Sequence, residues 1–349
     1  MVLKQVNAIA RTAFLESIQQ PIAFLLQLVS TVLTLVVPIF QFHRFGEDGR
    51  LARDSGLSCM LVFGMALAVG TAGRSVAGEI ANGTAASVLG KPVGRMLFVF
   101  SKWLGCVYLV AVFCLGQLAA TMVSERASAH FVMRDDFSGY ATDPISLMLA
   151  LGGLALVLAV AAALHFAKHR RFGVSVFWGI VLSQLLVAGF SGFYNRLGDW
   201  YPIHGEAACV GMNHVHTSET VHVLFYHPEL NVRVIPVAVL VFLVLLVFAA
   251  LATALSTRMQ TGGTLTVCTG VLLIGLSGDT FLSGGRFALL KRLVSGVLPD
   301  LQNFWLCDAI AHGGHVAVSY VLAAAGYALT CCLLFLLAGS LAFRGRDLG

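Results

Sequence analysis

Long apolar stretches separated by short polar segments dominate the pattern of this chain. Eight of them are long enough to cross a bilayer, which takes about 20 residues in a helix. Backbone groups in hydrocarbon must be hydrogen-bonded within the chain, so we expect helices. We place the spans at 21–42, 56–73, 103–123, 145–166, 172–194, 235–255, 261–278 and 316–343. The predicted fold class is therefore all-α, a polytopic integral membrane protein with a single transmembrane domain over residues 1–349.

The composition supports this fold class. The 349 residues are 58% hydrophobic and only 11% charged, whereas a soluble protein carries about 25% charged residues. The net charge of +5 is scattered along the chain. The lipid bilayer is thus the expected environment, and no nucleic-acid partner is expected.

Two short features refine the picture of the spans. Only residues 167–171 separate the fourth span from the fifth, which predicts a tight helical hairpin over 145–194. Before the first span, apolar residues recur at near-helical spacing within residues 1–20. This spacing predicts an amphipathic helix in the membrane interface, with a frayed extension of the first span as the alternative.

The distribution of charge predicts the orientation. With the N-terminus inside, the inner segments hold more than half of the 22 basic residues, but only Glu16, Glu79 and Asp347 of the 17 acidic ones. Cytoplasmic loops carry an excess of Lys and Arg. We therefore expect a multi-pass membrane protein with both termini cytoplasmic.

The inner loop 79–95 carries more structural signals than a simple reversal needs. A turn signal at 82–84 precedes Thr84, a plausible N-cap, and a short apolar segment that includes Val88 and Leu89. Gly90 can end that helix and Pro92 cannot continue it. A helix this short is marginal alone, so we expect it to rest on a partner surface or on the membrane face.

At this loop the sequence resembles the bacterial ABC-2-type transporter permeases. Their loop after the second span has a Glu, a Gly-Thr pair, a short apolar helix, Pro-Val and an Arg. This chain matches at Glu79, Gly83, Thr84, Leu89, Pro92, Val93 and Arg95, but has Ala85 where family members often have Leu. The segments 256–258, 299–305 and 343–348 also look like family motifs.

The resemblance implies a function, partners and a location in the bacterial cytoplasmic (inner) membrane. In that family the loop resembles a coupling helix, which docks into a separate ATP-binding cassette ATPase subunit. The implied interface residues are Glu79, Gly83, Thr84, Val88, Leu89, Pro92 and Arg95. The chain would be the permease subunit, pairing with a second permease subunit in a homodimer or heterodimer, with export as the expected direction. The family core has six spans, so the hairpin 145–194 looks like an insertion.

No enzymatic activity is expected from this chain. The segment 282–286 imitates the signature loop of ATP-binding cassette ATPases, but no phosphate-binding Walker A loop accompanies it. The spans contain no cluster of acid, base and nucleophile. We therefore predict no catalytic residue and no cofactor, and assign the ATPase activity to another chain.

The long outer loops 195–234 and 283–315 suggest an alternative function. The first is rich in histidine, and His214 and His216 are candidate ligands for a metal, although their spacing fits no standard zinc pattern. On this alternative, the chain is a polytopic protein outside the ABC class, with a metal-handling or scaffold role. The sequence leaves open whether Cys209 and Cys307, one in each loop, form a disulfide.

Ionisable residues are nearly missing from the predicted spans, which argues against an ion-coupled transporter. We interpret Lys102 as a residue that snorkels to the interface. Polar residues in the first and third spans could line a translocation surface, although hydrogen bonds between packed helices are the favoured interpretation. These residues are Gln27, Ser30, Thr31, Thr34 and Gln117.

Overall fold

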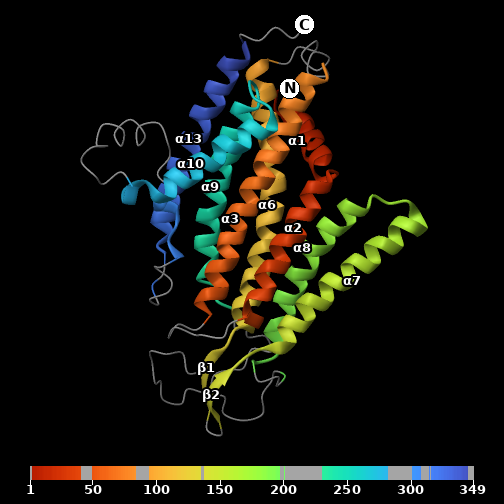
Figure 1. Ribbon diagram of the computed structural model, residues 1–349, viewed down its shortest axis with the longest axis vertical. Helices are drawn as coiled ribbons and strands as arrows, with labels where there is room; N and C mark the ends of the chain where they lie inside the picture. Colours follow the sequence, from red (N-terminus) through yellow and green to blue (C-terminus); the bar gives the residue numbers. More distant parts are fainter. Residues whose placement is uncertain are drawn as a thin grey trace. The chain divides into compact units, whose positions relative to one another are not determined.

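The computed structural model describes residues 2–40, 49–83, 94–134, 137–196, 200, 230–281, 301–307, 314 and 316–344. Nearly all of its regular structure is helical (Figure 1). The longer helices are α1 (Val2–Ile18), α2 (Pro21–Val36), α3 (Arg50–Ala72), α6 (Arg95–Ala127), α7 (Pro144–Lys168), α8 (Phe172–Phe190), α9 (Val234–Leu255), α10 (Thr261–Phe281) and α13 (Val318–Arg344). Short helical segments are η1 (Val37–Phe40), η2 (Gly73–Gly78), α4 (Glu79–Ala81), η3 (Ser191–Phe193) and η5 (Gln302–Phe304).

Seven of the described helices are long and apolar enough to cross a membrane. They correspond to seven of the eight predicted spans, so the all-α, polytopic fold class is confirmed. The remaining run forms α10, whose described apolar part, Thr261–Leu276, is shorter than a full span. The number of eight crossings therefore stays a prediction.

Two antiparallel strands depart from the purely helical expectation. β1 (His130–Arg134) pairs with β2 (Phe137–Ala141) in a register that places His130 opposite Ala141. The hairpin connects α6 to α7 (Figure 1). Its two short strands leave too short an alternating pattern in the sequence to be predicted beside the membrane spans.

Two of the helices extend well beyond the predicted spans. α3 begins at Arg50 rather than at residue 56, and α6 covers Arg95–Ala127 rather than 103–123. The 33 residues of α6 measure about 50 Å at 1.5 Å per residue, more than the roughly 30 Å of hydrocarbon. Both helices therefore continue into polar surroundings, where charged side chains are tolerated.

The chain divides into two compact units. Unit 1 contains residues 1–26, 60–114 and 235–349, and unit 2 contains residues 27–59 and 115–234. Helices α2, α3 and α6 contribute residues to both units. The contacts described below each lie within one unit.

In unit 2, α7 and α8 form the predicted helical hairpin (Figure 1). Asp143 caps the start of α7, where its side chain accepts a hydrogen bond from the backbone N–H of Ser146. His169 ends α7 in the left-handed conformation, with φ of 49°. A helix commonly ends at such a residue because the reversal satisfies its last carbonyl groups.

In unit 1, contacts bring several helix ends together. Arg95, at the start of α6, donates a hydrogen bond to the backbone oxygen of Phe343, near the end of α13. Arg258, just after α9, donates to the backbone oxygen of Ala342. These two bonds place the end of α13 beside the start of α6 and the end of α9.

The N-terminal segment forms the expected helix, α1, which packs against α6 within unit 1. An atom added as Cβ at Gly105 would lie 2.7 Å from both the backbone oxygen of Ala10 and the Cβ of Ala13. Ala10, Ala13 and Ile18 are buried, whereas Arg11 is exposed. The amphipathic pattern therefore faces protein at these positions, and the location of α1 in the membrane interface stays a prediction.

The close approach of α1 to α6 predicts that Gly105→Val lowers stability. The added side chain must push α1 away, and overpacking of this kind costs about 1–3 kcal/mol. Gly270→Val in α10 is the matched control, because nothing lies within 4 Å of its added Cβ. Thermal unfolding of the detergent-solubilised protein should show a lower midpoint for Gly105→Val alone. Equal midpoints would contradict the α1–α6 packing.

Candidate functional site

The loop 79–95 follows an irregular stretch of helix. At Gly73–Gly78, the helix that begins with α3 widens into a π-helix, η2, before one last α-helical turn, α4. Such segments are rare and often occur at functional sites. η2 contacts α1 and the start of α10, and an added Cβ at Gly73 would lie 2.5 Å from the Thr261 hydroxyl. The irregular turn is therefore held between two other helices.

The backbone at the beginning of the loop favours glycine. Gly83 has φ of +70°, in the left-handed region that glycine enters without steric cost. Its backbone N–H donates to the carbonyl of Ile80. Gly83 thus ends α4 and turns the chain, as its place in the predicted turn signal indicates.

A small ion cluster fixes the same end of the loop. The Lys102 ammonium, in the second turn of α6, donates a hydrogen bond to the Glu79 carboxylate in α4. It also lies 3.8 Å from the carboxylate of Glu16 in α1. Lys102 is only 3% exposed and lies 5.7 Å from the centre of the Phe98 ring. Lys102 therefore links the loop to α1, and its interpretation as a snorkelling residue was wrong.

The other end of the loop is fixed to α13. The Arg95 guanidinium donates to the Phe343 carbonyl at 3.0 Å and lies 5.6 Å from the centre of the Phe343 ring. Phe98, one turn further along α6, stacks on the same ring with centroids 6.0 Å apart. A cation near the last carbonyls of a helix also complements the helix dipole. The first turn of α6 and the last turn of α13 are therefore held together.

Three of the predicted interface residues belong to this arrangement. Glu79, Gly83 and Arg95 lie at the two ends of the loop. The other four fall within residues 84–93, outside the described residues, and their predicted short helix stays untested. These four are Thr84, Val88, Leu89 and Pro92.

The metal candidates His214 and His216 also fall outside the described residues, as does Cys209. Cys307 is buried, and whether it pairs with Cys209 stays untested. In the part of the chain that the structure describes, no three His, Cys, Asp or Glu residues are grouped so as to hold a metal ion. The metal-handling alternative therefore gains no supporting observation.

In unit 2, α2 and α6 meet along a buried polar seam. The Gln117 amide nitrogen donates to the Thr34 hydroxyl at 2.5 Å, and the Ser124 hydroxyl donates to the Thr34 backbone oxygen at 2.7 Å. Both bonds join one helix to the other, as the helix-packing interpretation expects. The seam is defined by Gln27, Ser30, Thr31, Thr34, Gln117, Thr121 and Ser124, all with 0% exposure.

A buried ion pair ties the end of α6 to the helical hairpin of unit 2. Arg126 donates to the Asp143 carboxylate at 2.7 Å and to the Tyr194 backbone oxygen at 2.7 Å. Its guanidinium also lies 4.9 Å from the centre of the Tyr194 ring. Ser146 completes the network, with hydroxyl distances of 2.7 Å to Asp143 and 2.6 Å to the Tyr194 hydroxyl.

A second buried pair lies next to the first along α6. Arg53, in α3, lies 3.6 Å from Glu125, and Asn231 donates to the same carboxylate at 2.7 Å. Arg53 and Glu125 are each 4% exposed. Both residues lie outside the predicted spans 56–73 and 103–123, in the parts of α3 and α6 that extend beyond them. The hydropathy pattern stops at the first charge, whereas the helices continue and their charges are neutralised in pairs.

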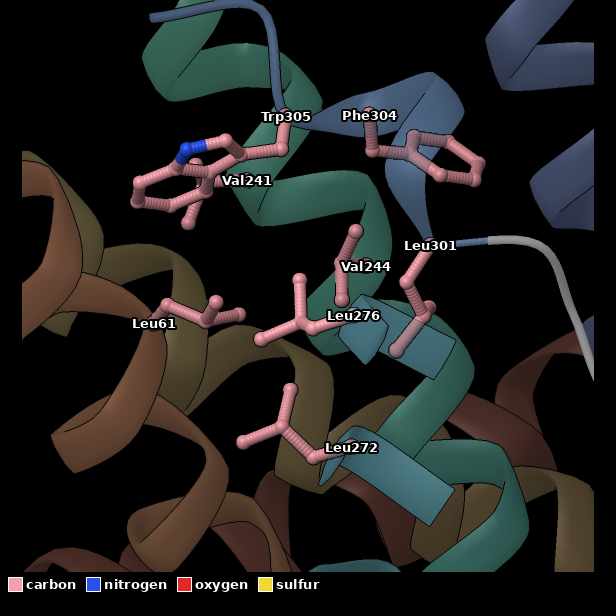
Figure 2. A pocket seen from close by; sticks show the side chains of 8 residues that line it. All are labelled: Leu61, Val241, Val244, Leu272, Leu276, Leu301, Phe304 and Trp305. Atoms are coloured by element: carbon pink, nitrogen blue, oxygen red, sulfur yellow. The ribbon is translucent and has the colours of Figure 1, made fainter. Parts of the chain in front are cut away.

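Unit 1 also contains one small apolar cavity (Figure 2). Its volume of about 10 Å³ is at the lower limit for a single water molecule. A cavity of this size and apolar lining cannot hold a transported substrate. The lining residues are Leu61, Val241, Val244, Leu272, Leu276, Leu301, Phe304 and Trp305.

Comparisons with known proteins do not identify a family. No family model matches the chain, and no curated protein matches it. The candidate site is therefore the loop 79–95 with its anchors to α1, α6 and α13, defined by the geometry of this chain alone.

The buried pair Arg126–Asp143 predicts a large loss of stability for Asp143→Asn. The substitution leaves the guanidinium buried beside a neutral amide, and breaking a buried pair costs about 3–5 kcal/mol. Arg50→Gln is the control, since the Arg50–Asp54 pair is partly exposed and such pairs contribute about 0–1 kcal/mol. Thermal unfolding in detergent should lower the midpoint strongly for Asp143→Asn only; similar midpoints would contradict the assigned network.

Proposed function

We propose that this chain is the membrane permease subunit of an ABC-2-type transporter, driven by a separate ATP-binding cassette ATPase. The observation that carries the proposal is the anchoring of the loop 79–95. Its first residues are joined through Lys102 to α6 and α1, and its last residue, Arg95, is joined to α13. A loop that merely reversed direction would not need such anchors at both ends.

The anchors give a physical route for movement. Attraction between opposite charges is stronger where water is excluded, and Lys102 is almost completely buried. A push on the loop therefore moves the first turns of α6 instead of being absorbed by exposed side chains. Because α1 packs closely on α6 at Gly105, the same push reaches the N-terminal helix.

The proposed assembly follows from the resemblance of the loop. The short helix expected within residues 84–93 would dock into the ATPase, with Val88 and Leu89 on the contacting face. A second permease subunit would complete the transporter in the bacterial inner membrane, with both termini in the cytoplasm. The ATPase would carry out all covalent chemistry, and this chain would couple its closure to rearrangement of the helices.

Co-purification with the ATPase tests the proposal. The double variant Gly83→Pro with Leu89→Asp should lose most of the bound ATPase. Proline fixes φ near −65° and cannot adopt the observed turn, and the aspartate places a charge in the apolar contact. Gly83→Asn is the matched control, because asparagine enters the left-handed region at small cost.

The control should bind the ATPase as the unsubstituted chain does, and all forms should unfold at similar temperatures. If the double variant retained full ATPase binding and transport, the loop would not be the coupling element.

The role of Lys102 can be separated from docking itself. Lys102→Gln should leave the ATPase bound but reduce the change in hydrogen exchange that nucleotide binding causes in α1, since the link from Glu79 to Glu16 is broken. Lys102→Arg keeps the charge and should preserve most of the response. An unchanged response in Lys102→Gln would show that movement does not pass through this residue.

A further inference from the structure

The turn between α7 and α8 presents a compact basic surface. All residues from His165 to Arg171 are exposed. The turn is ordered by its own backbone, because the carbonyl of Leu164 accepts hydrogen bonds from the N–H groups of both His169 and Arg170. The His165 ring nitrogen Nδ1 lies 2.8 Å from the Arg170 carbonyl oxygen. These contacts fix the backbone of the turn from which the basic side chains extend.

No negative charge within the hairpin balances this surface. Lys168, Arg170 and Arg171 lie together at the turn, and the segment 144–193 contains no Asp or Glu. None of these three side chains forms an ion pair within the described residues. The N-terminus of α8, at the same turn, adds the partial positive charge of a helix beginning. The turn therefore concentrates positive charge without an acidic partner among the described residues.

The surface next to the turn is apolar and faces away from the protein. Only 17% of the most apolar stretch of α7 is buried. Large side chains are exposed along its whole length, from Met148 at 71% through Leu156 at 65% to Phe166 at 80%. Phe166 lies two residues before Lys168, so the apolar surface ends where the basic surface begins.

The length of α7 places this boundary at the membrane surface. Its 25 residues extend about 37 Å, somewhat more than the roughly 30 Å of hydrocarbon. The ends of the helix therefore reach the depth of the lipid headgroups. An apolar strip that meets a basic turn at this depth matches a molecule with acyl chains and an anionic headgroup.

We propose that the α7–α8 turn binds an anionic phospholipid. Lys168, Arg170 and Arg171 surround the phosphate, and the acyl chains lie along the exposed strip that ends at Phe166. The hairpin is rigid enough to present this site, because Gly179 packs closely on Val157. This lipid-binding role of the hairpin does not depend on the transporter assignment.

Native mass spectrometry of the full-length, detergent-solubilised chain tests this site. The chain is titrated with phosphatidylglycerol or with phosphatidylcholine of the same acyl composition. We expect at least tenfold tighter binding of phosphatidylglycerol. The triple variant Lys168→Gln, Arg170→Gln and Arg171→Gln should reduce phosphatidylglycerol affinity by more than tenfold, since each basic residue near a membrane surface contributes about fivefold.

Matched variants identify what the turn recognises. Lys168→Arg with Arg170→Lys and Arg171→Lys keeps all three charges and should retain the affinity. Phe166→Ser should weaken phosphatidylglycerol binding severalfold. The preference for phosphatidylglycerol over phosphatidylcholine should stay unchanged. Inorganic phosphate and glycerol 3-phosphate, which lack acyl chains, should compete only weakly at millimolar concentration, whereas full displacement by either would show a soluble anion site and overturn the lipid assignment.

One further result would overturn the proposal, namely equal phosphatidylglycerol affinity for the triple glutamine variant and the unsubstituted chain at matched unfolding temperatures. If that variant also failed to co-purify with the ATPase, the basic turn would be assigned to a protein partner.

Discussion

A charge or amide removed from water must find a partner within the protein, and this requirement organises the whole structure. The cost of an unpaired charge in a low-dielectric interior is several kcal/mol, comparable with the entire stability of a typical domain. The chain meets it with buried pairs, Arg126–Asp143 and Arg53–Glu125 in unit 2 and Lys102–Glu79 in unit 1. Each pair joins elements that are separate in sequence, so the same contacts that neutralise charge also fix helices to one another.

The same requirement distinguishes the two polar loops that we interpret functionally. At the ends of the loop 79–95, Glu79 pairs with Lys102 and Arg95 donates to the Phe343 carbonyl, so both ends are anchored to neighbouring helices. At the α7–α8 turn, the basic side chains are exposed and have no acidic neighbours within the hairpin. The first arrangement suits the transmission of movement, and the second suits the binding of an external anion.

Much of the fold could be predicted because membrane helices are specified by local composition. The hairpin is the clearest case, since the basic residues between two apolar runs mark the place where α7 ends and α8 begins. Predictions failed where a helix outlasts its apolar run, as at the start of α3 and at both ends of α6. A charge ends a hydropathy run, but it does not end a helix whose backbone bonds continue. The motif was enough to select three residues of the candidate site, Glu79, Gly83 and Arg95. It could not predict that Glu79 pairs with Lys102.

The sequence by itself determined that this is a helical membrane protein, where most of its helices lie, and that Gly83 makes a turn. These properties depend on hydrophobicity and backbone preference over a few neighbouring residues. Only the tertiary structure decided which charged and polar side chains meet. Glu79 and Lys102 are 23 positions apart, and Glu125 and Asn231 are 106 positions apart. Such pairs depend on how whole helices pack, because a side chain finds its partner only after the helices that carry both have come together.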